Sequence, residues 1–176
     1  MQNSPFTNPN FLNLIFFPWQ TAFTTSTANS LLPCSKQKRL SHIGRLPTLG
    51  QLVDNVFSRC QLPAPVCLVT LIYLQRLKTR LPKCARGDFD TPYRLFLAAV
   101  LTSSKYMCES GTELTSHQIS AATEGIYCAR DINIMERSFL GLMSYDLWVH
   151  PHEITEFIAL YGDVLEMEMV KELALA

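Results

Sequence analysis

The sequence has little charge and no excess of either sign. Its 176 residues include 15 Lys and Arg against 15 Asp and Glu, and 17% of the residues are charged while 48% are hydrophobic. Without a net charge, the chain has no long-range field that would attract nucleic acid or an acidic membrane. The apolar composition instead favours one binding domain, part of whose surface is covered by a partner.

The chain also lacks the short motifs that mark common enzymes. It contains no G-x-G-x-x-G, phosphate-binding loop, H-E-x-x-H or G-x-S-x-G sequence. Ser104 beside Lys105 does not form the catalytic Ser–Lys pattern, because that pattern needs serine where Thr102 stands. His150 and His152 have no further candidate ligands near them, so we expect no metal, no cofactor and no enzymatic activity.

Secretory and membrane signals are absent from the sequence as well. The apolar run 11–17 has no basic residue before it, is cut off by Pro18, and is too short to cross a bilayer. The six cysteines are spaced too widely for a zinc knuckle, and four lie in or beside apolar helical runs, which favours reduced thiols. We therefore expect an intracellular protein of the nucleus and cytoplasm, without membrane contact.

Three regions follow from composition and periodicity. Residues 1–46 are rich in Asn, Ser, Thr and Pro, which predicts a disordered tail. The basic residues of 36–39 are either a nuclear localisation signal or an ordinary solvated run of charge. Residues 47–150 predict one all-α domain, and 151–176 a C-terminal helical segment opened by Pro151. The domain is expected to be built around 92–107, because a helix without a polar face must be surrounded.

Other helices are predicted around this central one. Thr48 is expected to cap a first helix, prolines 63 and 65 to open a second, Thr91 to cap the central helix, and Ser116 to cap a short fourth helix that ends at Gly125. The predicted apolar face of the first helix consists of Leu49, Leu52, Val53, Val56 and Phe57. A fifth helix is expected from near Asp131. Its predicted core face consists of Ile132, Met135, Phe139 and Leu142, and the last helix adds Ile154, Phe157, Ile158 and Leu160.

Two charges stand where the apolar helices should reach the surface. Lys105 lies at the end of the apolar run of the central helix, where a cation also interacts favourably with the helix dipole. Glu136 lies at the edge of the apolar stripe of the fifth helix, so its carboxylate needs a partner. Taken alone, either residue has an ordinary explanation as a surface charge.

Several strings resemble the cyclin box. These are LAAVLTSSKY at 97–106 and INIMER at 132–137, while VTLIYLQRL at 69–77, RLP at 80–82 and MSYDL at 143–147 are similar to fungal Pcl-type cyclins. The resemblance implies a single five-helix box around a buried central helix, followed by a short C-terminal helix. It also implies a regulatory subunit that binds and activates a cyclin-dependent serine/threonine kinase, with Lys105 and Glu136 binding the regulatory helix of that kinase.

Two other functions stay open at this point. The chain has Gln75 where many members of the family carry an acidic residue, which leaves room for a cyclin-like scaffold that binds a kinase without activating it. The other alternative is a transcription factor that has the cyclin fold and binds DNA. The balanced charge argues against it, because DNA binding draws its affinity from cations placed on phosphates.

Overall fold

The computed structural model describes residues 18–37, 46–108 and 113–163, and within them the chain is helical with no strand beyond one isolated bridge. The prediction of an all-α fold is confirmed. The helices are α1 (Pro18–Asn29), α2 (Leu49–Cys60), α3 (Ala64–Arg80), α4 (Thr91–Met107), α5 (Ser116–Ala122), α6 (Ala129–Leu142) and α7 (Pro151–Tyr161). No helix among the described residues is long and apolar enough to cross a membrane.

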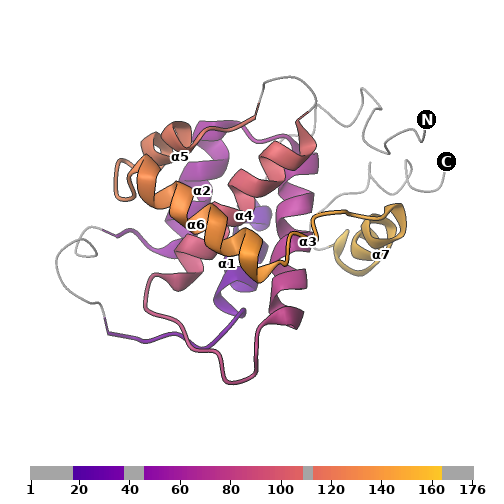
Figure 1. Cartoon of the computed structure of the whole chain (residues 1–176). Coiled ribbons are helices and arrows are strands. Elements are labelled where there is room, and N and C mark those ends of the chain that lie inside the picture. The colour runs from indigo at the N-terminus through magenta and orange to yellow at the C-terminus, as the bar shows by residue number, and fades with distance from the viewer. Residues whose placement is uncertain (1–17, 38–45, 109–112, 164–176) are drawn as a thin grey trace.

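Helix α4 is the centre of the bundle, as predicted. Figure 1 shows it in the middle of the molecule, and α3 and α6 are its main neighbours. Leu97, Ala98 and Leu101 are fully or almost fully buried. Even its polar residues are enclosed: Ser103 shares a hydrogen bond of 2.6 Å with Thr70 of α3. A hydroxyl pair of this kind lets two helices approach closely without leaving a buried polar atom unbonded.

The start of α4 lies one residue from its predicted place. We expected Thr91 to be the N-cap, but Thr91 is the first helical residue and Asp90 precedes it as the cap. The buried Asp90 carboxylate makes no capping hydrogen bond, and Oδ2 instead accepts from Arg94 Nε at 2.6 Å. The residue thus ties the helix start to its own first turn through charge rather than through the backbone cap.

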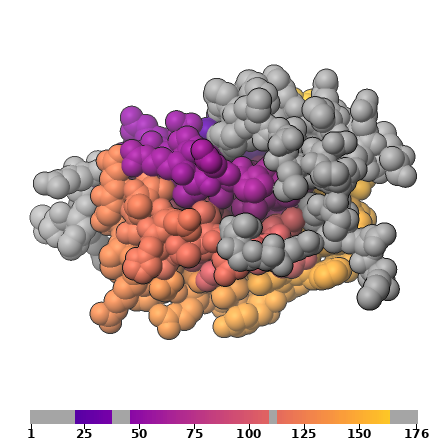
Figure 2. All heavy atoms as spheres, turned by 90° about the horizontal axis from the view of Figure 1, so that it is seen from above, coloured from indigo at the N-terminus to yellow at the C-terminus, as the bar shows by residue number. Residues whose placement is uncertain are grey.

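Helix α2 follows its sequence pattern closely. Thr48 forms a capping box, in which its hydroxyl accepts from Gln51 N–H while the Gln51 side chain accepts from Thr48 N–H. The predicted apolar face is the buried face, made of Leu49, Leu52, Val53, Val56 and Phe57. In Figure 2 the purple atoms of this region lie beside the orange atoms of α5 and α6, and α2 contacts α5 directly.

The prediction of a disordered tail over 1–46 is wrong for residues 18–37. Residues 18–29 form α1, which packs against α2, α3 and α4. Its inner row consists of Thr24, Ala28 and Leu31, which are buried at steps of four and three. The sequence shows no hydrophobic periodicity for this row, because its members are mostly small or polar. Small residues signal little hydrophobicity but allow a helix to approach its neighbour closely. Residues 1–17 and 38–45 lie outside the described part.

Smaller corrections concern the later helices. Thr115, not Ser116, caps α5, which ends at Ala122, and α6 begins at Ala129 rather than near Asp131. Leu142 and Leu160 are exposed, although both were predicted to lie in the core. Leu142 is the last residue of α6 and lies off its buried row, because that row continues from Phe139 to the fully buried Met143 four residues later.

Aromatic side chains join helix α1 to helix α7. The Phe23 ring packs edge-on against Phe157 with centroids 6.5 Å apart, and lies 5.1 Å from the ring of Tyr161. Phe157 and Tyr161 also contact each other at 4.9 Å. Aromatic contacts of this geometry add to the burial of their area. The first and last described helices are thereby joined to each other.

Candidate functional site

The structure brings the two predicted site residues together. Lys105 lies in the last turn of α4 and Glu136 in the middle of α6, two helices that pack side by side. Lys105 Nζ lies 2.8 Å from Glu136 Oε1 and 2.8 Å from Oε2, so that the ammonium sits between both carboxylate oxygens. The sequence predicted two separate charges, and the helix packing turns them into one ion pair.

The two partners of this pair differ in exposure. The Glu136 side chain is only 11% exposed, whereas the Lys105 side chain is 45% exposed. A carboxylate in so apolar a stripe needs a donor, and Lys105 supplies it. An ammonium has three N–H donors and can point one of them away from the carboxylate. The pair can therefore offer a donor, and part of a carboxylate, to a group that arrives from outside.

Exposed apolar side chains lie close to the pair in the chain. Among the described residues five large hydrophobic side chains are exposed, and three of them, Leu142, Tyr145 and Trp148, lie at or after the end of α6. Tyr106, the neighbour of Lys105, accepts a hydrogen bond from Val149 N–H at 3.2 Å. This contact links the end of α4 to the segment that carries Trp148. The exposed Trp148 side chain therefore lies on a segment that is joined to the residue following Lys105.

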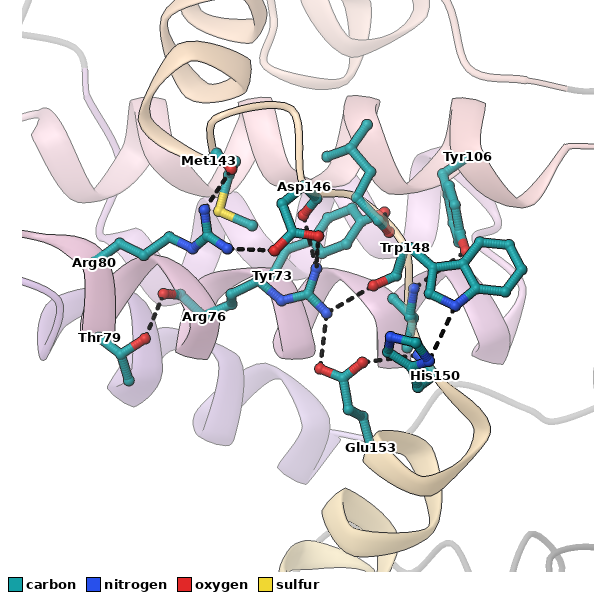
Figure 3. A network of polar contacts seen from close by, with 12 residues as sticks. Tyr73, Arg76, Thr79, Arg80, Tyr106, Met143, Asp146, Trp148, His150 and Glu153 are labelled. Carbon is teal, nitrogen blue, oxygen red and sulfur yellow. Dashed lines mark hydrogen bonds and ion pairs between the residues drawn. The ribbon is translucent and has the colours of Figure 1, made fainter.

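A second polar cluster fixes this segment from the side of α3. Figure 3 shows the Arg76 guanidinium between three groups of the chain beyond α6. It donates to the carbonyls of Asp146 at 2.7 Å and Trp148 at 3.0 Å, and to Glu153 Oε1 of α7 at 2.8 Å. A guanidinium presents its donors in a fixed fork, so these contacts set the path of the backbone.

Two further α3 residues complete this polar cluster. Arg80 donates to the Met143 carbonyl at 2.7 Å and is ion-paired with Asp146, and Tyr73 donates its hydroxyl hydrogen to the Leu147 carbonyl at 2.8 Å. Burial raises the pKa of Tyr73 above its ordinary value, so the phenol keeps that hydrogen. We call Tyr73, Arg76 and Arg80 with the segment 143–148 and Glu153 the Arg76 network.

Glu153 joins the Arg76 network to α7. Its Oε2 accepts from His150 N–H at 2.7 Å at the start of that helix. Burial works against the ionised form of Glu153, but the His150 N–H and the Arg76 guanidinium outweigh it and hold the pKa of the carboxyl below its ordinary value. The carboxylate therefore caps α7 and fastens it to α3 at the same time.

Sequence reasoning missed the Arg76 network. The basic end of α3 suggested only cations that suit a helix C-terminus, whereas Arg76 and Arg80 bind groups 63 to 77 residues further along the chain. No local spacing reveals such a partner. The available signal was the placement of arginine rather than lysine at both positions, since the fork of arginine suits backbone carbonyls.

The geometry alone describes a helical module with an ion pair across α4 and α6 and with exposed apolar side chains at and after the end of α6. The family model for cyclins matches residues 35–147. The chain belongs to the cyclin family.

Curated relatives agree with this assignment. The chain is 34% identical to PHO85 cyclin-1 of Saccharomyces cerevisiae over 113 residues, which cover 64% of this chain and 40% of that protein. It is 25% identical to PHO85 cyclin-9 over 117 residues (66% and 38%), and 23% identical to PHO85 cyclin-2 over 133 residues (75% and 42%), both from the same yeast. The chain thus matches about two fifths of the length of these relatives.

Proposed function

We propose that this chain is a regulatory subunit that binds and activates a cyclin-dependent serine/threonine kinase through the face around Lys105 and Glu136. The observation that carries the proposal is the ion pair itself, with 2.8 Å from Lys105 Nζ to each carboxylate oxygen. The two residues that the family resemblance assigns to kinase binding meet across α4 and α6. The matched relatives are named as cyclins of PHO85, so the proposed partner is a kinase of that kind.

The proposed basis of binding is the charge of the ion pair together with the apolar area of the segment that Tyr106 joins to the end of α4. A partner that covers Lys105 removes water from the pair, which strengthens every hydrogen bond made to it. Tyr145 and Trp148 are 69% and 58% exposed, and aromatic side chains of this size are typical anchors of protein interfaces. The Arg76 network holds their backbone in place, so little ordering is needed on binding.

Activation would follow from a shift in the conformations of the kinase. Phosphoryl transfer in protein kinases depends on a lysine–glutamate ion pair whose glutamate lies on a mobile helix of the kinase. A subunit that binds the active position of this helix more tightly than the inactive one shifts the population towards activity. The proposed subunit carries out no chemistry itself. It acts through residues of about 47–150, in the nucleus and the cytoplasm.

The proposal is tested by titrating a purified PHO85-type kinase with the chain and following both binding and the phosphorylation of a peptide substrate. We expect a saturable complex and a rise in kinase activity at the same concentrations. Binding without a rise in activity would instead support the scaffold alternative. Failure to bind any cyclin-dependent kinase, together with salt-sensitive binding to duplex DNA, would replace the proposal by the transcription-factor alternative.

A further inference from the structure

The isolated bridge between Cys34 and Gly87 brings together two parts of the chain that are far apart in sequence. Ser35 N–H donates to the Gly87 carbonyl at 2.9 Å, and Gly87 N–H donates to the Pro33 carbonyl at 3.0 Å. The segment after α1 is therefore tied to the loop between α3 and α4. Lys36, which follows the bridge, is placed beside this loop.

Four exposed cations lie on the segments that the bridge and the Lys78–Ser30 hydrogen bond join at this end of α4. Lys83 and Arg86 lie in the loop, Lys78 lies in the last turn of α3, and Lys36 follows the bridge; all four are exposed. Arg86 Nη1 donates to the carbonyls of Lys83 at 3.3 Å and Ala85 at 2.8 Å, which folds the guanidinium over the loop. We call Lys36, Lys78, Lys83 and Arg86 the basic cluster.

The basic cluster carries charge that the described part of the chain leaves without an ion pair. Arg76 and Arg80 have carboxylate partners within 4.0 Å, whereas no such partner is found among the described residues for any member of the cluster. Lys78 bonds only the hydroxyl of Ser30, at 3.1 Å. The loop also contains one exposed carboxylate, Asp88, which offsets one of the four positive charges without forming an ion pair with any of them. Neighbouring cations without acidic partners raise the local concentration of anions.

We propose that the basic cluster binds a phosphorylated segment of a partner protein. A phosphate group brings nearly two negative charges and three acceptor oxygens, which suit one guanidinium and the lysines around it. The proposal rests on the proposed function in one respect, because a kinase subunit works among phosphorylated proteins. The surface itself lies apart from Lys105 and Glu136, at the opposite end of α4.

A protein segment fits this surface better than a nucleic acid does. Affinity for nucleic acid grows with the number of phosphates that are contacted at once, and four cations in a chain of zero net charge provide few such contacts. One or two phosphate groups on a peptide are matched by the same four cations. In the same loop the partly buried side chain of Phe89 packs against the hydrophobic core and anchors the loop backbone.

Gly87 is the positioning residue of the basic cluster. A Cβ at this position would lie 2.8 Å from the Thr91 side chain and 2.9 Å from Cys34 Sγ, which is closer than real Cβ contacts come. The two segments can approach this closely only because residue 87 has no side chain. Gly87→Ala should therefore separate Lys36 from Arg86 while leaving every charge of the cluster in the chain.

The experiment measures fluorescence anisotropy of a labelled peptide with two phosphoserines, titrated with the full chain at low and at physiological salt. We expect the phosphorylated peptide to bind about tenfold or more tightly than its unphosphorylated form. The double variant Lys83→Ala with Arg86→Ala should abolish this preference. The matched control, Arg130→Ala with Arg137→Ala, removes two exposed cations of α6 and should leave the preference unchanged.

Three results would overturn the proposal: equal binding of both peptides, an equal loss of preference in the control variant, or tighter binding of single-stranded DNA with the same number of phosphates. Gly87→Ala provides a second test, since it should reduce the preference for the phosphorylated peptide although all charges of the cluster are present. Kinase binding by the variants of the cluster should equal that of the unmodified chain. If the unmodified chain binds no kinase, the proposed function fails, while the peptide result still decides the basic cluster.

Discussion

Lys105 and Arg76 both carry a charge at the end of an apolar helix, but their surroundings differ. The Arg76 side chain is 12% exposed and bonds two backbone carbonyls and a carboxylate, whereas the Lys105 side chain is 45% exposed and bonds one carboxylate. Arg76 therefore determines where the chain runs. The ammonium of Lys105 bonds a side chain and no backbone carbonyl, so it does not fix the path of the chain. Its exposure leaves it accessible to a partner.

This difference separates the roles that similar ion pairs play in one small domain. Removing a buried cation that bonds carbonyls leaves those acceptors unsatisfied, which costs free energy in the free protein. Removing the half-exposed Lys105 leaves the mostly buried Glu136 carboxylate without its donor, but water can enter the space of the lost side chain, so the cost in the free protein is smaller. The full loss appears when a bound partner excludes that water. Stability and binding should thus respond to different substitutions, and the following predictions test this separation.

The largest expected effect is on kinase binding. Lys105→Ala and Glu136→Ala should each weaken binding of the proposed kinase by about 2–5 kcal/mol, or from about thirtyfold to several thousandfold, because each leaves a charge unpaired at a dry interface. Isothermal titration calorimetry with the purified kinase measures this change. Activation of the kinase should decline in parallel.

The control for this prediction is another exposed ion pair of the same chain. Arg59 Nη2 lies 2.6 Å from Glu124 Oε1, with side chains 46% and 64% exposed, and joins α2 to the α5–α6 loop. Arg59→Ala and Glu124→Ala should leave kinase binding unchanged. If these variants weaken binding as much as Lys105→Ala does, the face around Lys105 and Glu136 is not the specific site.

The next effect is on stability and belongs to Arg76. Arg76→Ala should lower the free energy of unfolding by about 2–4 kcal/mol, because it leaves two carbonyls and the Glu153 carboxylate without their donor. Urea denaturation followed by circular dichroism measures the change. A loss of less than about 1 kcal/mol would mean that the Arg76 network does not hold the segment 143–148.

A conservative variant sharpens the comparison. Arg76→Lys keeps the charge but loses the planar fork that reaches Asp146, Trp148 and Glu153 together, so it should recover only part of the stability lost in Arg76→Ala. Full recovery in the same denaturation experiment would show that the charge matters and the fork does not. The corresponding exchange Lys105→Arg should leave stability unchanged, since no carbonyl depends on it.

Acid should weaken the Arg76 network before it affects the core. The pKa of Glu153 is held below its ordinary value of 4.5 in the folded chain, so its contribution to stability is present above that value and is lost as the pH falls through the folded pKa. Thermal unfolding between pH 7 and pH 3 should show this loss. In Glu153→Gln the part of the decline due to this carboxyl should be missing.

The smallest expected effect is that of Lys105 on stability. Lys105→Ala should lower the free energy of unfolding by about 1 kcal/mol, because the mostly buried Glu136 carboxylate loses its donor while water replaces the half-exposed lysine. Measured beside Arg76→Ala under the same conditions, it should differ clearly in size. A loss as large as that of Arg76→Ala would remove the distinction between the two sites.

The sequence predicted those parts of the fold that depend on a strong local pattern. The largely apolar run 92–107 became the buried central helix, and the predicted face of α2 was right in every residue. Helix α1 was missed because close packing through Thr24 and Ala28 needs no hydrophobic period. Leu142 was wrongly placed in the core because a step of three and a step of four from Phe139 are equally helical, and the structure buries Met143 at the step of four.

The candidate site was predictable as residues but not as an arrangement. The sequence and the resemblance indicated Lys105 and Glu136, yet only the packing of α4 on α6 shows that they contact each other. Arg76, Asp146 and Glu153 could not be joined from the sequence, since their contacts depend on the tertiary path of the chain. The role of the pair in kinase binding stays a prediction.

The contact of Phe23 with Phe157 and Tyr161 has a consequence for the order in which the chain folds. These residues lie near opposite ends of the described chain, so their contact closes a long loop, which costs more entropy than the neighbouring helix contacts do. It should form late, after α3 and α4 have assembled, and open first. Hydrogen exchange should therefore release the amides of α7 well before those of α4, as separate steps of unfolding.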